Sequence, residues 1–423
     1  MPTDQERDPV AIRISHKLDG LPAASISFNN CLLGVRDPLH NVDKPTSVAI
    51  GPRYRGEREL QEMEKQKLKY LKQLLERLRE NTVDKYVVEI RGLEQRAWEF
   101  LHLDDQTTSF SRDEFVEMLL LDGCCIIELF RRYKNKDKQQ EEDHDLIMAK
   151  DEVQASLRRE LRRDLILLDN QIPFFIIDHL FKKTRLRSEH NDDIIRLALG
   201  FLKWVVPNQR LEVVNNGTEV KHLLGLVHHS WGCQFIRALN NNRPGDADKK
   251  WGFVDSATEL QEAGVEFQMV KTTNLFDVQF NSGIMEIPRL TIKEYTEFPF
   301  RNIVLYEQRH LQADQRKYVS DYMAFINCLV NSPRDVQLLR HRNIIESSIA
   351  NDTTVYNMLK DLSRLVQISS ENFCYFQVCL DVNRHCRQRK NAWIAKLKFA
   401  AFLLLFLTIV QTLFSVLAYF KGS

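Results

Sequence analysis

The stretch DLILLDNQIPFFIIDHLF, residues 164–181, is the strongest internal signature of this 423-residue chain. Two apolar blocks flank Asp169, Asn170 and Gln171, and Pro173 follows them. Proline cannot continue a helix, but it fits the first turn of a new one. The stretch therefore predicts two buried helical segments joined at a polar break. Because an unsatisfied buried polar group costs about 1–3 kcal/mol, we expect these polar side chains to cap the break and to fix its angle.

Helical patterns lie on both sides of this stretch. Over residues 60–78, Leu and Met recur at three- and four-residue steps while Glu and Lys fill the other face, which is typical of an amphipathic helix. Ser111 and Glu114 have the spacing of a capping box ahead of a second helix. Ser332 and Pro333 indicate the start of a further helix. We therefore expect a mainly helical chain.

A strand pattern occurs near residues 265–292. Apolar and polar residues alternate over 265–269 and again over 276–280, and the turn sequence Asn281-Ser282-Gly283 precedes a third apolar run. An Asn-Ser-Gly joint between such runs favours an antiparallel hairpin. The expected fold class is α+β, mainly α with a small antiparallel β element.

The domain organisation follows from composition. Residues 1–29 are polar and lack periodicity, so we expect a disordered N-terminal arm. A composition of 43% hydrophobic and 28% charged residues is ordinary for a globular protein. Residues 30–383 are therefore expected to form one mostly helical globular domain that contains the β-hairpin.

The most apolar run is FAAFLLLFLTIVQTLFSVLAYF, residues 399–420, which carries no formal charge. At about 1.5 Å rise per residue, such a helix matches a hydrocarbon core of about 30 Å. The run predicts a single-pass C-terminal transmembrane helix, inserted after translation as a tail anchor. The residues that represent this membrane anchor are Phe399, Leu404, Ile409, Gln411, Ser415 and Phe420.

Basic residues are concentrated before this run, in a basic juxtamembrane helix expected over residues 384–398. They are Arg384, Arg387, Arg389, Lys390, Lys396 and Lys398, whereas only Lys421 follows the run. The positive-inside rule then places the N-terminal domain in the cytosol, at the plasma membrane or an endomembrane. In the opposite topology, which stays open, Asn216 and Asn351 would be glycosylation acceptors.

The expected partners are the lipid bilayer and a protein that the sequence does not identify. Within residues 399–420, small and polar residues such as Thr408, Gln411 and Ser415 recur on one side of the helix. Such a stripe is how membrane helices pack on one another, which would give a homo-oligomer through this helix. The alternative is that the hydroxyls are simply bonded to their own backbone.

Motifs for chemistry are absent from the sequence. Lys plus Arg total 59 against 58 for Asp plus Glu, so there is no basic field for nucleic acid and we expect no nucleic-acid partner. GxSxG, GxxxxGK, GxGxxG, HExxH and CxxC do not occur. Cys374, Cys379, His385 and Cys386 lack the paired spacing of a zinc site. We expect no metal, no cofactor and no catalytic residue, and hence no enzyme.

Several stretches together resemble one family. They are residues 49–56 (AIGPRYRG), 60–71 (LQEMEKQKLKYL), 114–129 (EFVEMLLLDGCCIIEL), 164–181, 257–267 (ATELQEAGVEF), 275–292 (LFDVQFNSGIMEIPRLTI), 300–308 (FRNIVLYEQ) and the C-terminal apolar run. In this order they resemble the plant proteins grouped as domain of unknown function 247, also called UPF0481. The chain departs from the family at Asp169, where Glu is usual, and at residues 53–55, where Tyr-His-His is usual.

The resemblance implies a plant membrane protein with a mostly helical domain ahead of a C-terminal anchor, and it brings no established catalytic activity. In grasses, members are linked to self-incompatibility, which implies that some act in recognition between cells. We expect a membrane-anchored interaction or recognition module that presents its helical domain to a protein partner. Two alternatives stay open: an enzyme of unrecognised type centred on residues 169–171, and a structural membrane tether.

Overall fold

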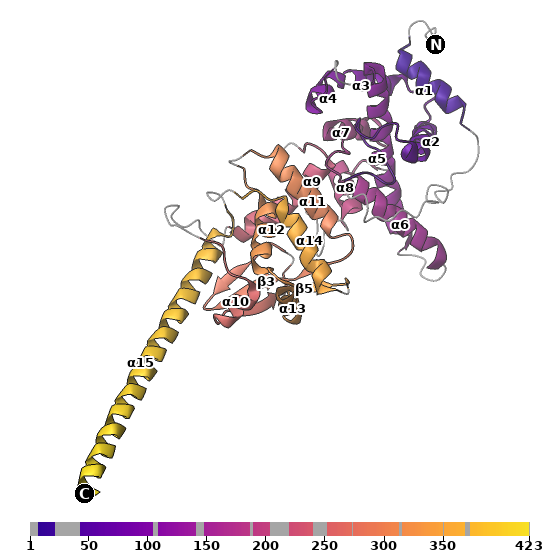
Figure 1. Ribbon diagram of the computed structural model, residues 1–423. Helices are drawn as coiled ribbons and strands as arrows, with labels where there is room; N and C mark the ends of the chain where they lie inside the picture. Colours follow the sequence, from indigo (N-terminus) through magenta and orange to yellow (C-terminus); the bar gives the residue numbers. More distant parts are fainter. Residues whose placement is uncertain are drawn as a thin grey trace. The chain divides into compact units, whose positions relative to one another are not determined.

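The computed structural model describes residues 7–21, 43–104, 109–140, 148–186, 189–203, 220–239, 252–272, 274–312, 315–349, 351–368 and 373–422. Over these residues the protein is mainly helical with a few short strands (Figure 1), as predicted. The chain divides into two compact units. Unit 1 comprises residues 1–237 and 294–319, and unit 2 comprises residues 238–293 and 320–423. The single domain expected over residues 30–383 is thus distributed over two units.

Unit 1 is built from helices. They are α1 (Pro9–Asp19), the 3-10 helix η2 (Arg58–Leu60), α2 (Gln61–Leu78), α3 (Asp84–Arg91), α4 (Glu94–Phe100), α5 (Arg112–Gln140), α6 (Met148–Asp164), α7 (Phe174–Lys183), α8 (Ile194–Leu202), most of α9 (Leu223–Leu239) and α11 (Glu297–His310).

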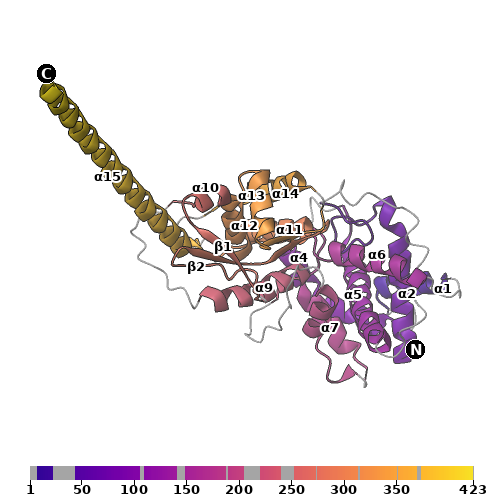
Figure 2. The same ribbon diagram turned by 90° about the horizontal axis from the view of Figure 1, so that it is seen from below.

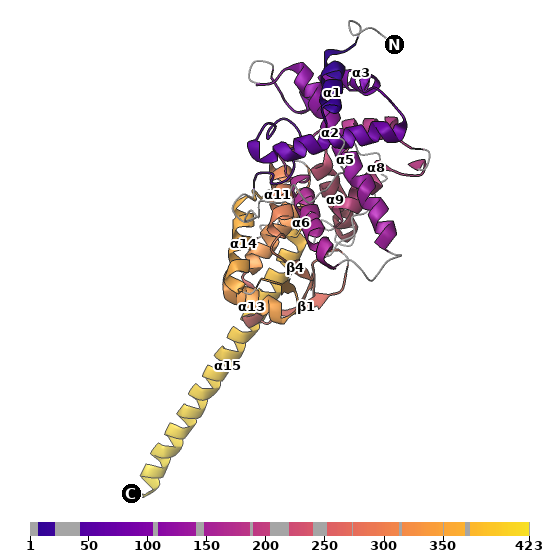
Figure 3. The same ribbon diagram turned by 90° about the vertical axis from the view of Figure 1, so that its right-hand side faces the viewer.

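Helix α5 is the centre of unit 1. It packs against α1, α2, α3, α7 and α8, and Figure 3 shows α2 lying across it. Every residue of α5 from 115 to 131 is buried, because neighbours surround the helix on all sides. A Cβ atom on Gly123 would lie 2.5 Å from Cδ1 of Leu180. Glycine at this position therefore lets α7 pack closely on α5.

Helix α1 lies within the arm that we expected to be disordered. Asp8 caps the helix by accepting a hydrogen bond from the N–H of Val10, and Pro9 occupies the first turn. Val10 and Ile14 are fully buried, and the helix packs against α5, α2 and α3. Because so short a helix has few apolar repeats and gains its stability from tertiary packing, composition alone did not reveal it. The structure thus differs from the expected arm over residues 9–19.

Unit 2 contains two small sheets and several helices. Its elements are α10 (Ala257–Glu262), β1 (Glu266–Val270), β2 (Gln279–Asn281), β3 (Ile284–Pro288), β4 (Leu290–Ile292), most of α12 (Tyr318–Leu329), α13 (Pro333–His341), β5 (Ile345–Ser347), α14 (Asp352–Arg364) and α15 (Phe376–Gly422).

The larger sheet is mixed, with the strand order β1-β3-β2. Strands β2 and β3 form the expected antiparallel hairpin, with Ser282 and Gly283 at positive φ in its turn. Strand β1 pairs with β3 in parallel, Phe267 opposite Met285, so an antiparallel element over the whole of 265–292 is wrong. Because β3 lies between β1 and β2, the connection from β1 to β2 cannot be a tight hairpin. The smaller sheet pairs β4 with β5, also in parallel.

Helix α15 contains the run that we expected to span a membrane. Its first turns lie beside β2 (Figure 2), and Phe399, Leu404 and Ile409 are exposed. Among the described residues, no helix is long and apolar enough to cross a membrane. The prediction of a single-pass transmembrane helix at residues 399–420 is therefore wrong.

Candidate functional site

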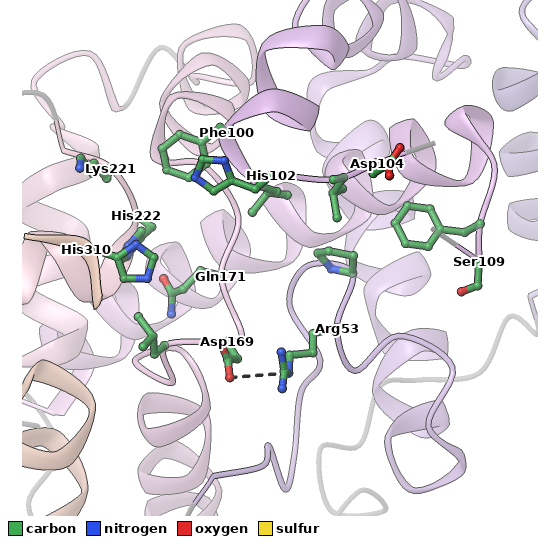
Figure 4. Close-up of a pocket in the computed structure, with 15 residues that line it drawn as sticks. Arg53, Phe100, His102, Asp104, Ser109, Asp169, Gln171, Lys221, His222 and His310 are labelled. Carbon is green, nitrogen blue, oxygen red and sulfur yellow. Dashed lines mark ion pairs between the residues drawn. The ribbon is translucent and has the colours of Figure 1, made fainter. Parts of the chain in front are cut away.

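A pocket with a volume of about 650 Å³ lies in unit 1 (Figure 4). Parts of the chain that are far apart in sequence line it: a turn before η2, the segment that follows α4, the polar break, the residues before α9 and the end of α11. The lining residues are Pro52, Arg53, Phe100, Leu101, His102, Leu103, Asp104, Ser109, Phe110, Leu168, Asp169, Gln171, Lys221, His222 and His310.

Gln171 joins the polar break to the start of α9. Its buried Nε2 donates hydrogen bonds to the carbonyl oxygens of Leu165 at 2.9 Å and Leu167 at 2.8 Å. Its Oε1 accepts a hydrogen bond from the N–H of Leu224 at 3.3 Å, one of the orphan donors at the N-terminus of α9. The side chain that lines the pocket is therefore fixed in position by three bonds.

Asn170 lies beneath the pocket rather than in its lining. Its fully buried Oδ1 accepts a hydrogen bond from the N–H of Ile50 at 2.7 Å, and its Nδ2 donates to the carbonyl oxygens of Val48 and Asp164. Pro173 is the N-cap residue of α7. The polar break thus organises the segment 46–51, which is neither helix nor strand.

Asp164 holds the same segment from the end of α6. Its carboxylate is fully buried and accepts hydrogen bonds from the backbone N–H groups of Thr46, Ser47 and Val48, at 2.6–3.1 Å. Burial raises the pKa of Asp164 to about 7, although these backbone donors and the charge of Arg163 act in the opposite direction.

Gly51 brings this segment against the polar break. It has a positive φ of 79°, and a Cβ atom would lie 2.4 Å from the carbonyl oxygen of Gln171. Its N–H donates to Oδ2 of Asp122 at 2.8 Å, and the buried Nζ of Lys67 lies 2.6 Å from Oδ1 of the same carboxylate. Burial lowers the pKa of Lys67, but the charges of Asp122 and Glu64 outweigh it and raise that pKa above its usual value. The turn that carries Pro52 and Arg53 into the pocket is therefore anchored on both sides.

One end of the pocket carries two imidazole rings and one ammonium group. Figure 4 shows His222, His310 and Lys221 at this end. Nδ1 of His222 accepts a hydrogen bond from the N–H of Gly225 at 3.0 Å, so the ring proton of the neutral imidazole resides on Nε2. Burial lowers the pKa of His222 to about 3, with smaller contributions from His310 and Lys221. His222 is therefore a neutral donor at physiological pH.

His310 lies at the C-terminal end of α11. Its ring stacks on Tyr306 with 5.6 Å between centroids and lies 6.5 Å from that of His222. Partial burial lowers the pKa of His310, and the charges of Lys221 and Arg309 lower it further, whereas Asp169 raises it. Burial is the largest cause of the lowered pKa, and the neighbouring positive charges act in the same direction.

His102 lies just after α4, the helix that carries Phe100 in the pocket wall. It has a left-handed φ of 52°, as the residue that follows a helix often does, although glycine is the usual choice. The N–H of Leu103 returns to the carbonyl oxygen of Trp98 at 3.2 Å and closes the last turn of α4. This termination directs Phe100, His102 and Leu103 into the pocket lining.

Aromatic contacts support this wall from behind. Trp98 packs edge-on against Phe110, with 5.9 Å between ring centroids, and the guanidinium of Arg112 lies 3.8 Å from the Trp98 ring centre. Phe100 packs edge-on against Phe175 at 6.2 Å. Such pairs contribute about 0.5–1.5 kcal/mol each beyond area burial, and they hold the aromatic lining in place.

Asp169 faces Arg53 across the pocket, with 3.6 Å between Oδ2 and Nε (Figure 4). Both side chains are substantially exposed, so the ion pair adds little stability. An exposed pair can exchange one partner for a ligand group at small cost. Asp169 therefore contributes polarity and adaptability to the pocket rather than rigidity.

Outside the polar break and the turn before η2, the described residues that the sequence singled out are not among those that line the pocket. Asn351 caps α14 by accepting a hydrogen bond from the N–H of Thr353, and Asn216 lies outside the described residues. In α15, Arg384 pairs with Asp381 at 2.8 Å, and Arg389 lies against Gly264. Thr408 and Thr412 donate to backbone carbonyls of their own helix.

Sequence reasoning found Asp169 and Gln171 but missed the imidazoles. His102, His222 and His310 come from three distant segments and share no spacing that would connect them. The only local signal was at His222, which begins an apolar segment and has the position of a helix cap. The juxtaposition itself depends on long-range packing.

The arrangement is suited to binding. Ser109 is exposed, and among the described residues its hydroxyl has no imidazole or carboxylate within hydrogen-bond distance. The described part of the chain holds no cluster of three or more His, Cys, Asp or Glu side chains with the geometry of a metal site. The lining consists of a polar end, an aromatic wall and a floor at Gln171 that hydrogen bonds hold in place.

The chain is similar in sequence to known plant proteins. The family model DUF247, described as a plant protein of unknown function, matches residues 35–420. The UPF0481 protein At3g47200 of Arabidopsis thaliana is 24% identical over 420 residues, which cover 90% of this chain and 84% of the relative. The putative UPF0481 protein At3g02645 of Arabidopsis thaliana is 29% identical over 146 residues, which cover 34% and 27%. No solved structure matches the chain.

Proposed function

Because the chain belongs to the plant family DUF247, whose function is unknown, we propose its function from geometry alone: it is a non-catalytic recognition module that binds a ligand in the pocket of unit 1. The membership confirms the resemblance inferred from the sequence. The recognition role that the sequence led us to expect is here assigned to a defined site.

The observation that carries the proposal is that hydrogen bonds and close contacts hold the floor of the pocket in place, around Gln171, Gly51 and Leu168. Gln171 makes three hydrogen bonds, and Gly51 is held by Asp122 and by close contact with Gln171. Leu168 is held in turn by Oδ1 of Asn302, which accepts its N–H at 3.0 Å. A site that is already ordered loses little conformational entropy when it binds. A pocket floor that is already ordered therefore favours ligand binding.

The size and lining of the pocket also support binding. Ligand sites typically have volumes of about 300–1,000 Å³, with mostly apolar walls and a few polar groups that fix orientation. The pocket has a volume of about 650 Å³, with Phe100, Leu103 and Phe110 among its walls. It would enclose a small organic molecule or one or two side chains of a partner.

Geometry favours binding over catalysis at residues 169–171. A catalytic base should lie within hydrogen-bond reach of a nucleophile or of the substrate proton. Asp169 faces Arg53 instead, and the polar atoms of Gln171 are used by the backbone. Gln171 thus stabilises the backbone around the break, and Asp169 balances the charge of Arg53.

The proposal is tested by ligand-induced stabilisation of the full chain. A library of small molecules is screened by thermal unfolding against the wild type, against Ser109→Trp, which obstructs the pocket from an exposed position, and against Val88→Trp. Val88 is 65% exposed on α3 and does not line the pocket. A ligand at 100 times its Kd should add about 2.7 kcal/mol to the wild type and to Val88→Trp, but not to Ser109→Trp.

Mass spectrometry of the recovered ligand completes the experiment. We expect the ligand to be returned unchanged. A chemically converted ligand would establish the enzyme alternative instead. Equal stabilisation of all three proteins would place the binding site elsewhere, and the failure of every compound to stabilise the wild type would also overturn the proposal.

A further inference from the structure

The chemistry of the pocket indicates what it binds, an inference that rests on the proposed function. We infer that the pocket takes an organic anion with an apolar body, with the acidic group between Lys221, His222 and His310 and the body against Phe100, Leu103 and Phe110. Each half of this ligand is argued from a different part of the lining.

The acidic group would meet donors that are not used elsewhere. Lys221 is exposed, and its ammonium makes no hydrogen bond or ion pair with any residue that the structure describes. His222 is only 6% exposed, and its Nδ1 is occupied by the N–H of Gly225. Its Nε2–H therefore remains a donor in the pocket lining, with no protein acceptor among the described residues. A ligand oxygen that enters the pocket can accept a hydrogen bond from this donor.

The charges around this end favour an anion over a cation. The charged groups that act on His310 are Lys221, Arg309 and Asp169, and His102 also faces it. Asp169 is the acid among them, and it lies 3.6 Å from Arg53. The other acidic lining residue, Asp104, lies toward the opposite end of the pocket in Figure 4. Among the described residues, the imidazole end thus carries more positive than negative charge, from Lys221 and Arg309.

The body of the ligand would lie along the apolar wall. Phe100, Leu103 and Phe110 line it together with Pro52 and Leu168, and Trp98 and Phe175 support the two phenylalanines from behind. Rigid aromatic walls bind flat apolar groups through offset or edge-on contacts. An aromatic acid satisfies both ends of the pocket at once.

The test compares head groups on one apolar body by isothermal titration of the full chain. The probes are naphthalenesulfonate, which is anionic, naphthalenemethanol, which is neutral, and naphthyl trimethylammonium, which is cationic. We expect the anion to bind at least about tenfold more tightly than the neutral compound, since a charge-assisted hydrogen bond is worth about that factor. The cation should not bind measurably.

Variants identify the groups responsible. Lys221→Met removes the charge from an exposed side chain and should weaken binding of the anion about tenfold, without affecting the neutral compound. Lys221→Arg should restore the affinity. Lys65→Met, at an exposed lysine of α2 that does not line the pocket, is the matched control and should bind like the wild type.

The outcomes separate this inference from the proposed function. If the neutral or cationic compound binds as tightly as the anion, and Ser109→Trp abolishes that binding, the anion assignment is overturned while recognition by the pocket stands. If Lys221→Met binds the anion like the wild type, the assignment is overturned as well. If none of the three compounds binds, the aromatic-acid class is excluded, and the library screen decides the proposed function by itself.

Discussion

Gly51 is the residue at which the polar break and the segment 46–51 approach most closely. Its φ of 79° lies in the left-handed region, where a side chain costs about 1–2 kcal/mol. The carbonyl oxygen of Gln171 occupies the space that a Cβ atom would need. Two separate costs therefore act at this position, backbone strain and a clash with backbone atoms.

Gly51→Ala should lower the free energy of unfolding by more than about 3 kcal/mol, because neither backbone segment can move without breaking buried hydrogen bonds. Gly56→Ala is the matched control: φ is 86°, but no atom lies within 4 Å of the added Cβ, so only the strain of about 1–2 kcal/mol applies. Urea unfolding measures both. Equal losses in the two variants would contradict the close approach at Gly51.

Asp164 should make stability depend on pH. Burial raises its pKa from 3.8 to about 7 in the folded protein, so the folded state holds a proton that the unfolded state releases. The stability contributed by this group is complete below pH about 4 and is lost as pH rises through 7. Asp164→Asn keeps an oxygen that can accept from residues 46–48 and cannot ionise. The variant should therefore gain stability relative to the wild type between pH 4 and 8.

Chemical denaturation of both proteins across this pH range measures the difference directly. Subtracting the wild type from the variant removes the contributions of every other titrating group. A difference that is constant with pH, or that falls as pH rises, would show that the buried carboxylate does not titrate in this range.

At the scale of elements, α1 is held to unit 1 by a few buried side chains. Ile14 is fully buried, whereas His16 is exposed on the same helix. Ile14→Ala should cost about 2–5 kcal/mol through lost burial and the cavity left behind. His16→Ala should change stability by no more than about 0.5 kcal/mol. Thermal unfolding compares the two, and identical small effects would mean that α1 is not docked in solution.

Elements with strong local signals could be predicted from the sequence. Ser111 and Glu114 form the capping box that their spacing indicated, and Pro333 stands in the first turn of α13 after the N-cap Ser332. The hairpin of β2 and β3 follows from Asn281-Ser282-Gly283. The parallel pairing of β1 with β3 has no such signal, because a strand's alternation does not encode the direction of its partner.

At the scale of the whole molecule, local sequence predicted the importance of residues 169–171 but not what surrounds them. The pocket joins residues near 52, 102, 169, 222 and 310, which are far apart in the sequence and meet only through long-range packing. Apolar composition alone also misled us at residues 399–420, where the described helices include none able to span a membrane. An apolar composition by itself does not determine what surrounds a helix.

The central claim is that the pocket of unit 1 is a preformed site for an organic anion. A crystal structure of the full chain with naphthalenesulfonate tests it most directly. We predict that the sulfonate lies within hydrogen-bond distance of Lys221 and of Nε2 of His222, that the ring system lies against Phe100 and Phe110, and that the positions of Gly51 and Gln171 are unchanged from the unliganded protein. A ligand bound outside this pocket, or a pocket that is empty at saturating ligand, would contradict the account.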